Sequence, residues 1–584
     1  MSDYAYGNRQ WYGGGTEPPT LRLEGAIKQA ADVCRQRLVV LSVVFCAAFL
    51  IIAGRLVEIM AFEPEDQGLF TLTQTVAPLG RSDIVDRNGI LLATSLPTAS
   101  LYADPRHIID AQEAAVMLES VLPDLEFDDL IRKLSSDRGF IWVKRNLTPR
   151  QQADIHNLGI PGFGFVREER RIYPLGSLTS QVVGFTDIDR HGLAGTEEAF
   201  DLELQSRDDA AGAPLNLSLD IRFQQIVRDE LIATIDKFHA IGGAGIVLDV
   251  HTGEVLAMVS LPDFDSNRAG EASEDERFNR ATLGVYEVGS IFKVFTAAMA
   301  LDAGVVDMES GYDASQPIRI SHYTIRDYKP KNRWLSLPEI LVYSSNIGAA
   351  KMALDVGADR QRAFLQRVGL LSLSQIELPE NAQPMAPSPW RDINTMTIGF
   401  GHGIAVTPIS LVSAIAAMVN GGTLYEPTIL KWTAEQPPPG VQVISPETSD
   451  AVRLLMHLVV RYGSGRQAQV PGYLIGGKTG TAEKLDSRGG YDEDSLLSSF
   501  VSAFPIDDPR YVVLAMIDEP KGIEESYGYA TGGWTAAPTV GRIIARIGPL
   551  AGIAPHDGTL PVLQQAGMDQ DSDLEAILAA FSTH

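Results

Sequence analysis

A serine and a lysine three positions apart, Ser290 and Lys293, form a pair of residues that could act together in catalysis. Side chains at this spacing lie on the same face of a helix. The segment from Ile291 to Leu301 is apolar on nearly every side, which predicts a buried helix that ends near Gly304. A lysine held in apolar surroundings loses affinity for its proton and can then deprotonate a neighbouring hydroxyl. The alternative is a chance pairing on the surface, but no other lysine in the chain has a serine three residues before it.

Two further polar groups stand later in the chain. Ser344-Ser345-Asn346 begins 54 residues after Ser290 (344 − 290), and Lys478-Thr479-Gly480-Thr481 follows much later. Taken alone, the first group could be a helix cap and the second an edge strand that ends in a turn.

The second group has the pattern of a strand, because it follows an apolar run. Alternation along a strand places Thr479 and Thr481 on one face and Lys478 on the other. Two hydroxyls and an ammonium form a suitable receptor for a carboxylate. Gly480 has no side chain, and we expect that a substrate backbone can approach closely there.

The three groups occur in the order that marks the serine β-lactamase and penicillin-binding superfamily. Across nearly its whole length the chain resembles the class B penicillin-binding proteins. The segments that carry this resemblance outside the three groups are 81–93, 171–174, 192–197, 249–258 and 279–282. The segment 398–408 resembles the corresponding segment of the division-specific branch, the FtsI family. No glycosyltransferase domain precedes the pedestal segments, which separates the chain from the bifunctional class A proteins. The chain departs from the family pattern at Ser82, where glycine is usual, and at Val288, where proline is usual.

The resemblance implies a peptidoglycan D,D-transpeptidase that acts on stem peptides ending in D-Ala-D-Ala. Ser290 would attack the penultimate D-Ala carbonyl after Lys293 removes its proton, and Ser344 would pass a proton to the departing nitrogen. Lys478 would tune that transfer and Asn346 would hold the peptide amide. The carboxylate site would comprise Thr479, Gly480 and Thr481, and the backbone N–H groups of Ser290 and Thr481 would form the oxyanion hole.

The same resemblance implies that no metal or organic cofactor is needed and that β-lactams acylate Ser290. It also implies partners in a division complex, among them a polytopic glycosyltransferase, and a place at the septum. Three alternatives remain open at this stage. They are an elongation-specific transpeptidase, a β-lactam-binding sensor or scaffold, and a β-lactamase that hydrolyses its acyl-enzyme.

The composition limits the class of partner and the chemistry. A formal net charge of −26 argues against a nucleic-acid partner, which requires a basic surface. The two cysteines, Cys34 and Cys46, both lie in or beside the first apolar segment, so neither a disulfide nor a cysteine metal site can form later in the chain.

That apolar segment predicts a membrane anchor. Leu38 to Gly54 contains 17 residues and no charge, slightly fewer than the ~20 that span a bilayer, and apolar residues continue to Met60. Basic residues are more frequent before the segment than after it, which predicts a cytoplasmic N-terminus and a catalytic domain outside the cytoplasm. With the family resemblance, this implies a single-pass anchor in the bacterial inner membrane. A cleaved signal peptide and a buried core helix are the alternatives.

The remaining chain predicts a multi-domain α+β fold. Asn88-Gly89 lies between apolar runs and predicts a hairpin in a structural pedestal, which also carries helices over 112–121 and 127–134. In the next domain we expect a strand over 216–220 and a helix over 221–238. Two hairpins, one around 252–253 and one around 507–509, suggest a single antiparallel sheet with helices on both faces.

The predicted parts of the chain are a cytoplasmic tail (1–37), an anchor (38–60), a pedestal (61–212), a transpeptidase domain (213–553) and a loosely attached acidic tail (554–584).

Overall fold

The computed structural model describes residues 35, 37, 39–53, 81–205, 213–320, 323–433, 438–485, 491–556, 558–560, 563 and 574–581. The chain divides into two compact units, Met1–Ala77 and Pro78–His584. In the first unit, residues 39–53 are helical and their large apolar side chains are exposed, for example Val39 at 57 % and Ile51 at 73 %. Within the residues described, no helix is both long and apolar enough to span a membrane. The predicted cytoplasmic tail and the rest of the predicted anchor lie outside the described residues, apart from residues 35 and 37.

The second unit begins with the hairpin predicted at Asn88-Gly89. Strand β1 (Ile84–Val85) pairs antiparallel with β2 (Leu91–Ala103). The carboxylate of Asp86 accepts hydrogen bonds from the backbone N–H groups of Asn88 and Ile90, both at 2.8 Å, which closes the turn. The predicted hairpin is therefore confirmed.

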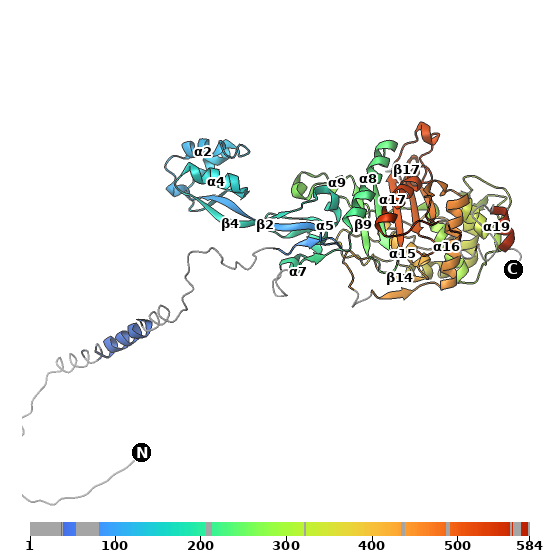
Figure 1. The fold of residues 1–584 in the computed structure, drawn as a ribbon, viewed down its shortest axis with the longest axis horizontal. Helices are drawn as coiled ribbons and strands as arrows, with labels where there is room; N and C mark the ends of the chain where they lie inside the picture. Colours follow the sequence, from blue (N-terminus) through green and yellow to red (C-terminus); the bar gives the residue numbers. More distant parts are fainter. Residues whose placement is uncertain are drawn as a thin grey trace, which may run out of the picture. The chain divides into compact units, whose positions relative to one another are not determined.

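Strand β2 is the long axis of the pedestal (Figure 1). It pairs with β3 (Ile141–Leu147) and β4 (Phe163–Ile172). Helices α2 (Ala111–Glu119), α3 (Phe127–Leu134) and α4 (Pro149–Leu158) pack on one end of this ribbon around a small core that includes Leu101 and Leu118. The two helices predicted over 112–121 and 127–134 are present as α2 and α3.

At the other end of the pedestal, a buried cluster of ion pairs links residues that are far apart in the sequence. Arg81 and Arg171 both donate to the carboxylate of Glu197, and Arg81 also donates to Asp201 at 2.6 Å. Glu197 has no exposed surface. Arg81, Arg171 and Glu197 come from three separate segments that carried the sequence resemblance, so these segments meet in the cluster and hold this end of the pedestal together. The short element η1 (Pro105–His107) follows β2 at the end that carries α2, α3 and α4. The short elements after β4 are η2 (Gly176–Thr179), α5 (Ser180–Val183), β5 (Phe185–Thr186), β6 (Gly192–Ala194), α6 (Gly195–Ala199), α7 (Asp201–Gln205) and β7 (Leu215–Asn216).

The next part of the chain is built on one antiparallel sheet of five strands. Its order is β16-β17-β18-β8-β9, with β16 at one edge. Strands from both ends of the domain therefore meet in the same sheet, as predicted. Their bounds are β8 (Gly242–Asp249), β9 (Val255–Leu261), β16 (Gly476–Leu485), β17 (Tyr491–Phe504) and β18 (Tyr511–Asp518).

Helices cover both faces of this sheet (Figure 1). Helices α8 (Ile221–Phe238) and α17 (Ala536–Leu550) pack on one face through residues such as Val227, Val513 and Val540. Helices α10 (Lys293–Asp302), α15 (Pro408–Val419) and α16 (Pro446–Tyr462) pack on the other. The predicted α+β architecture of this domain is therefore confirmed.

The remaining elements connect or border these layers. They are η3 (Ser266–Glu271), α9 (Glu274–Arg277), η4 (Gly289–Phe292), β10 (Gly311–Asp313), β11 (Ile318–Ile320), β12 (Tyr323–Ile325), β13 (Trp334–Ser336), α11 (Leu337–Val342), α12 (Asn346–Val356), α13 (Ala358–Arg367), α14 (Asp392–Ile398), β14 (Thr423–Tyr425), β15 (Gly440–Gln442), η5 (Arg466–Ala468), η6 (Glu524–Ser526) and α19 (Leu574–Phe581).

Two predictions about the elements are wrong. The strand expected over 216–220 is limited to β7, because Asp220 caps α8 by accepting from the backbone N–H of Arg222 at 3.0 Å. The C-terminal tail is not loosely attached throughout. Leu560 and Leu563, which precede α19, and Ile577 within α19 are buried in the main hydrophobic core.

Candidate active site

Ser290 lies on a tight turn that leads directly into a buried helix. The turn is the 3₁₀ segment η4, and α10 continues from it at Lys293. Gly289 adopts φ +53°, and a β-carbon there would come within 2.5 Å of the carbonyl oxygen of Thr481. The turn that carries the serine is thus pressed against strand β16, and the helix ends before Gly304 (φ +64°), as predicted.

The ammonium group of Lys293 is the centre of the site. Its Nζ lies 2.7 Å from Ser290 Oγ, 2.7 Å from Asn346 Oδ1, 2.9 Å from the carbonyl oxygen of Ser344 and 3.1 Å from Ser344 Oγ. Lys293 itself is almost completely buried. The structure therefore brings together Ser290, Lys293, Ser344 and Asn346, all of which the sequence predicted for one site.

Burial lowers the pKa of Lys293 well below its usual value, and the nearby Lys478 lowers it further, while Asp327 opposes the change. Because a neutral amine has two hydrogens and one lone pair, its surroundings can be assigned. Asn346 Oδ1 and the Ser344 carbonyl can only accept, so they take the two hydrogens. The lone pair is then left for the hydroxyl hydrogen of Ser290, which is the arrangement that a general base requires.

Ser344 lies between the two lysines. Its Oγ is 3.1 Å from Lys293 Nζ and 3.1 Å from Lys478 Nζ. The residue has φ +58°, a left-handed conformation that is strained for serine. This conformation directs both its carbonyl oxygen and its hydroxyl toward Lys293, so the strained backbone serves the site.

Helix α12 positions Asn346 at its first residue. Ser345 caps the helix by accepting from the backbone N–H of Gly348 at 3.0 Å. The side-chain Nδ2 of Asn346 donates to the carbonyl oxygen of Arg326 at 3.0 Å. Asn346 therefore orients Lys293 within the protein, and its predicted contact with the peptide amide of a substrate stays a prediction.

Strand β16 carries the predicted carboxylate site along one edge of the sheet. Lys478 is buried, and burial lowers its pKa to about 7. Thr479 Oγ1 lies 2.6 Å from Ser464 Oγ. Thr481 Oγ1 accepts from the backbone N–H of Gly532 at 3.1 Å, so its own hydroxyl hydrogen can be donated to a ligand.

The reason for glycine at position 480 differs from the expected one. A β-carbon on Gly480 would come within 2.4 Å of both Ser499 Oγ and the carbonyl oxygen of Val288. The space is therefore filled by the protein itself, because β16 packs against the turn that precedes Ser290. This packing alone requires glycine at position 480, and the expected close approach of a substrate backbone stays a prediction.

Two residues that support the site were not predicted. Asp327 accepts from Ser345 Oγ at 2.8 Å and from the backbone N–H of Ile347 at 2.9 Å, and Ser464 contacts Thr479. Ser464 stands between two glycines shortly before β16, a pattern that could have indicated a turn at the site. No local pattern marks Asp327, because its partners are brought to it only by the fold.

Two family models match the chain, one in each part of the second unit. Residues 243–545 match the penicillin binding protein transpeptidase domain, and residues 76–211 match the penicillin-binding protein dimerisation domain. A dimerisation domain followed by a transpeptidase domain, with the serine and lysine groups described above, is the organisation of a class B penicillin-binding protein.

Relatives of known name narrow the assignment. The chain is 42% identical over 482 residues to the probable peptidoglycan D,D-transpeptidase FtsI of Caulobacter vibrioides, which covers 81% of this chain and 82% of that protein. It is 33% identical over 512 residues to the probable peptidoglycan D,D-transpeptidase PenA of Neisseria meningitidis, covering 83% and 86% of the two chains. The chain belongs to the FtsI family of class B penicillin-binding proteins.

Solved structures agree with this fold. The transpeptidase domain of penicillin-binding protein 3 from Burkholderia pseudomallei has a TM-score of 0.52 and 33% identity, and covers 58% of this chain and 97% of that one. Penicillin-binding protein 3 from Mycobacterium tuberculosis, in complex with aztreonam, has a TM-score of 0.65 at 24% identity, covering 82% and 98% of the two chains.

Proposed function

We propose that this protein is a peptidoglycan D,D-transpeptidase that crosslinks stem peptides through an acyl-enzyme on Ser290 during septal cell-wall synthesis. The observation that carries the proposal is the 2.7 Å approach of Lys293 Nζ to Ser290 Oγ, together with the lowered pKa of that buried lysine. Its membership of a family whose named relatives are D,D-transpeptidases supports the substrate class.

The first half of the reaction forms the acyl-enzyme. Ser290 Oγ attacks the carbonyl carbon of the penultimate D-Ala as its proton passes to Lys293 Nζ. The proton then moves through Ser344 Oγ, which contacts both lysines, to the nitrogen of the terminal D-Ala. The peptide bond breaks, D-alanine departs with its new proton, and Ser290 retains the acyl group.

In the second half, the amine of another stem peptide attacks the acyl-enzyme. Lys293, neutral again, accepts a proton from that amine, and the ester bond to Ser290 breaks as the oxygen recovers its hydrogen. A new amide crosslink results, and no net proton is gained or lost by the enzyme. The backbone N–H groups of Ser290 and Thr481 are assigned to the oxyanion, whose donors contribute on the order of a hundredfold each in related chemistry.

The terminal carboxylate of the donor peptide is assigned to Thr479 and Thr481, with Lys478 behind them. A hydroxyl hydrogen on Thr481 is available because Gly532 already donates to its oxygen. Strand β16 is at the edge of the sheet, so an extended peptide can also add to it through main-chain hydrogen bonds.

Labelling of membranes that contain the full-length protein with a fluorescent penicillin tests the covalent assignment. We expect Ser290→Ala to abolish labelling while the fold persists, since only one hydroxyl is removed. Ser315→Ala, a serine in a loop remote from Lys293 in the hydrogen-bond network, serves as the matched control and should label normally. Labelling of Ser290→Ala at another mapped residue would refute the assignment.

We also propose that residues 38–60 anchor the protein in the bacterial inner membrane. The apolar side chains of residues 39–53 are exposed on their helix, and exposed helical surface of this kind is stable in lipid rather than in water. On this proposal, partners in the division complex, including a polytopic glycosyltransferase, contact the anchor or the pedestal. A reporter fused after Ile59 should be active only outside the cytoplasm; a mature N-terminus beyond Gly54 would show a cleaved signal instead.

A further inference from the structure

A cavity of about 640 Å³ lies in the transpeptidase domain apart from the catalytic groups. It is open to solvent on one side and is lined by the C-terminal end of α16, by η5, by the loop that leads into β16 and by residues near His556. None of the residues from Ser290 to Thr481 that we assign to catalysis or carboxylate binding lines it. Cavities of roughly 300–1,000 Å³ hold small organic ligands in other proteins.

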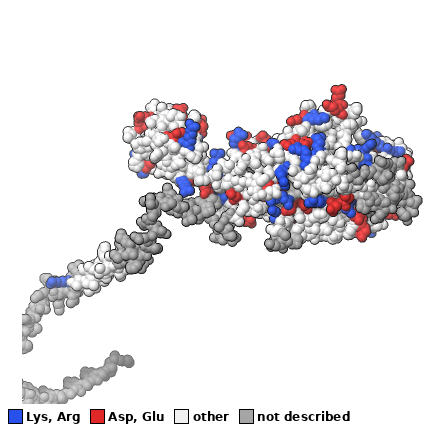
Figure 2. Space-filling view, in the orientation of Figure 1, with Lys and Arg blue, Asp and Glu red and all other residues white. Residues whose placement is uncertain are grey.

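Two arginines, Arg461 and Arg466, line this cavity together with the imidazole rings of His457 and His556. Burial lowers the pKa of His457, so the arginines are the cations of this lining. Among the described residues that line it there is no aspartate or glutamate, although the whole chain has a net charge of −26 and carboxylates are interspersed with basic groups over the face of the domain seen in Figure 2. One carboxylate contacts a residue of the lining: Asp507 pairs with His556 at 3.2 Å.

Arg461 is held in place by contacts with a tyrosine rather than with a carboxylate. Arg461 lies over the ring of Tyr462, 5.4 Å from its centroid, and its Nε donates to the Tyr462 hydroxyl at 2.7 Å. Within the described part of the chain, neither Arg461 nor Arg466 forms an ion pair. Each guanidinium therefore keeps terminal N–H donors that match the two oxygens of a carboxylate.

His457 adds a buried polar group on the same wall. The side chain is 6% exposed, and its Nδ1 lies 3.0 Å from the carbonyl oxygen of Ile475, which can only accept. Nδ1 therefore carries the hydrogen, and Nε2 has no protein partner among the residues described here. A ligand in the cavity can supply that partner.

Apolar and aromatic side chains form the rest of the wall. The ring of Tyr473 is fixed by its hydroxyl, which donates to the carbonyl oxygen of Ile553 at 3.2 Å, and by an edge contact with Phe504. Val470 and Leu474 lie beside it. The cavity thus combines an apolar surface with two cationic side chains, which suits an organic body that carries acidic groups.

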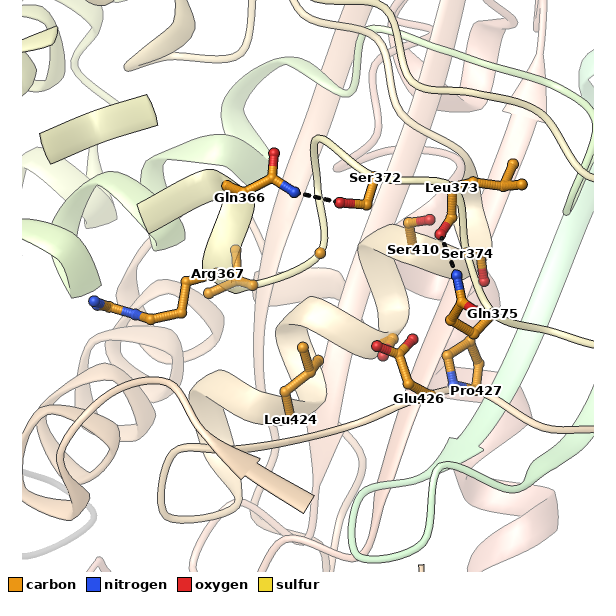
Figure 3. Close-up of a pocket in the computed structure, with 13 residues that line it drawn as sticks. Gln366, Arg367, Ser372, Leu373, Ser374, Gln375, Ser410, Leu424, Glu426 and Pro427 are labelled. Carbon is orange, nitrogen blue, oxygen red and sulfur yellow. Dashed lines mark hydrogen bonds between the residues drawn. The ribbon is translucent and has the colours of Figure 1, made fainter. Parts of the chain in front are cut away.

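A second hollow of about 270 Å³ provides a contrast (Figure 3). Its lining consists mainly of hydroxyl and amide groups, and its one acidic side chain is Glu426. Figure 3 shows Arg367 directed away from Glu426, and that arginine pairs with Asp302 at 3.4 Å. The one basic residue that lines this hollow is therefore already paired, so the hollow suits an anionic ligand less well than the larger cavity does.

We propose that the cavity between α16, η5 and β16 binds a small organic dicarboxylate with an apolar or aromatic body, through Arg461 and Arg466. Ser464, which contacts Thr479, lies in the same loop between these arginines. The proposed site is thus linked to strand β16 through Ser464, but it shares no lining residue with the groups assigned to catalysis or carboxylate binding.

Calorimetric titration of the full-length protein in detergent with isophthalate tests the proposal. We expect a dissociation constant of about 1 mM or lower, and no binding of the neutral diamide isophthalamide. Replacing both arginines, in Arg461→Ala/Arg466→Ala, should weaken isophthalate binding at least about tenfold, since a charge-assisted hydrogen bond contributes more than that factor.

The matched control is Arg360→Ala/Arg362→Ala, which removes two exposed arginines of α13 and the same net charge. It should bind isophthalate as the wild type does. Normal penicillin labelling shows that each variant is folded, and the single change Arg466→Ala, at an exposed residue, provides a second variant that cannot disturb the core. The proposal is overturned if isophthalate does not bind, if isophthalamide binds equally well, or if the two double variants have the same affinity.

Discussion

Both buried lysines of the site have lowered pKa values, but their hydrogen-bond partners differ. Lys293 is surrounded by acceptors that leave its lone pair directed at Ser290, so its neutral form is the useful one. Lys478 has a pKa of about 7 because of burial alone. Near neutral pH it can therefore hold or release a proton while Ser344 connects it to Lys293.

Burial of Lys478 predicts a stability that depends on pH. The folded pKa of about 7 is below the ~10.4 of an unfolded lysine, so the unfolded chain binds more protons between these values. The free energy of unfolding should therefore rise as pH increases from 7 to 10.4, and the destabilising effect of the charge should be complete below pH 7. Lys478→Met removes the charge and should raise the free energy of unfolding by about 2 kcal/mol at pH 6, after the loss of its hydrogen bonds.

Denaturant unfolding of the full-length protein, followed by tryptophan fluorescence at pH 6 and pH 10, measures this difference. Lys484→Met is the matched control on the same strand, because Lys484 pairs with Asp518 and Glu519 and its pKa is raised. It should not stabilise the protein at either pH. An equal effect of Lys478→Met at both pH values would show that the buried lysine is not the source.

Most of the catalytic residues could be predicted because each group is contiguous in sequence. Ser290 and Lys293 are three residues apart, and Ser344 and Asn346 are two apart, so local geometry already orients them. Asp327 and Ser464 act through contacts made only after folding, and no spacing rule identifies them. Gly480 was recognised as special, but the atoms that fill its space come from Val288 and Ser499, and these contacts are a property of packing.

At the level of elements, the turn before Ser290 is held between two neighbours. Gly289 contacts Thr481 on one side, and Gly401 contacts Gly289 on the other. A β-carbon on Gly401 would lie 1.9 Å from the carbonyl oxygen of Gly289, and Gly401 has φ +91°. Any side chain at this position must therefore displace the turn that carries the nucleophile.

Gly401→Ala should slow penicillin acylation of Ser290 by about a hundredfold or more, because displacement of a reacting group by 1 Å has an effect of that order. Gly421→Ala is the matched control, since Gly421 has φ +90° and no atom within 4 Å of the added carbon. That control carries the same backbone strain, about 1–2 kcal/mol, and should be acylated at the normal rate. Stopped-flow acylation rates for the two variants decide the matter; equal rates would mean that the turn is not held by this contact.

The elements that the sequence predicted well are those with long periodic patterns. Helix α8 runs over Ile221–Phe238, as expected, and the hairpin of β8 and β9 has the expected turn. The strand expected over 216–220 failed because the chain after β7 pairs irregularly, with Ser218 donating to the carbonyl oxygen of Ile429 before Asp220 starts the helix. In the tail, the acidic composition suggested loose attachment, but the segment also contains apolar residues, and one of these, Ile577, is buried.

At the scale of the whole molecule, the pedestal and the catalytic domain form one compact unit. Gly195 of the pedestal donates its backbone N–H to Glu380 of the catalytic domain at 3.0 Å, and Asn267 contacts the backbone of Tyr173. The same end of the pedestal contains the buried cluster around Glu197. The pedestal therefore contacts the catalytic domain directly, at the same end that the buried cluster stabilises.

The chemistry at Ser290 does not distinguish septal from lateral wall synthesis, because the same acyl transfer serves both. The assignment to division depends on the FtsI family membership and on the segment 398–408, which includes Gly401 and lies against the turn that carries Ser290.

If the protein acts at the septum, its loss leaves lateral wall synthesis intact. Depletion in a rod-shaped host should then produce filaments with unfinished constrictions, and a fluorescent fusion should concentrate at midcell. Complementation with Ser290→Ala should fail, whereas Ser315→Ala should restore division. Rounded cells with a dispersed fusion would assign the protein to elongation and leave the acyl-enzyme chemistry unchanged.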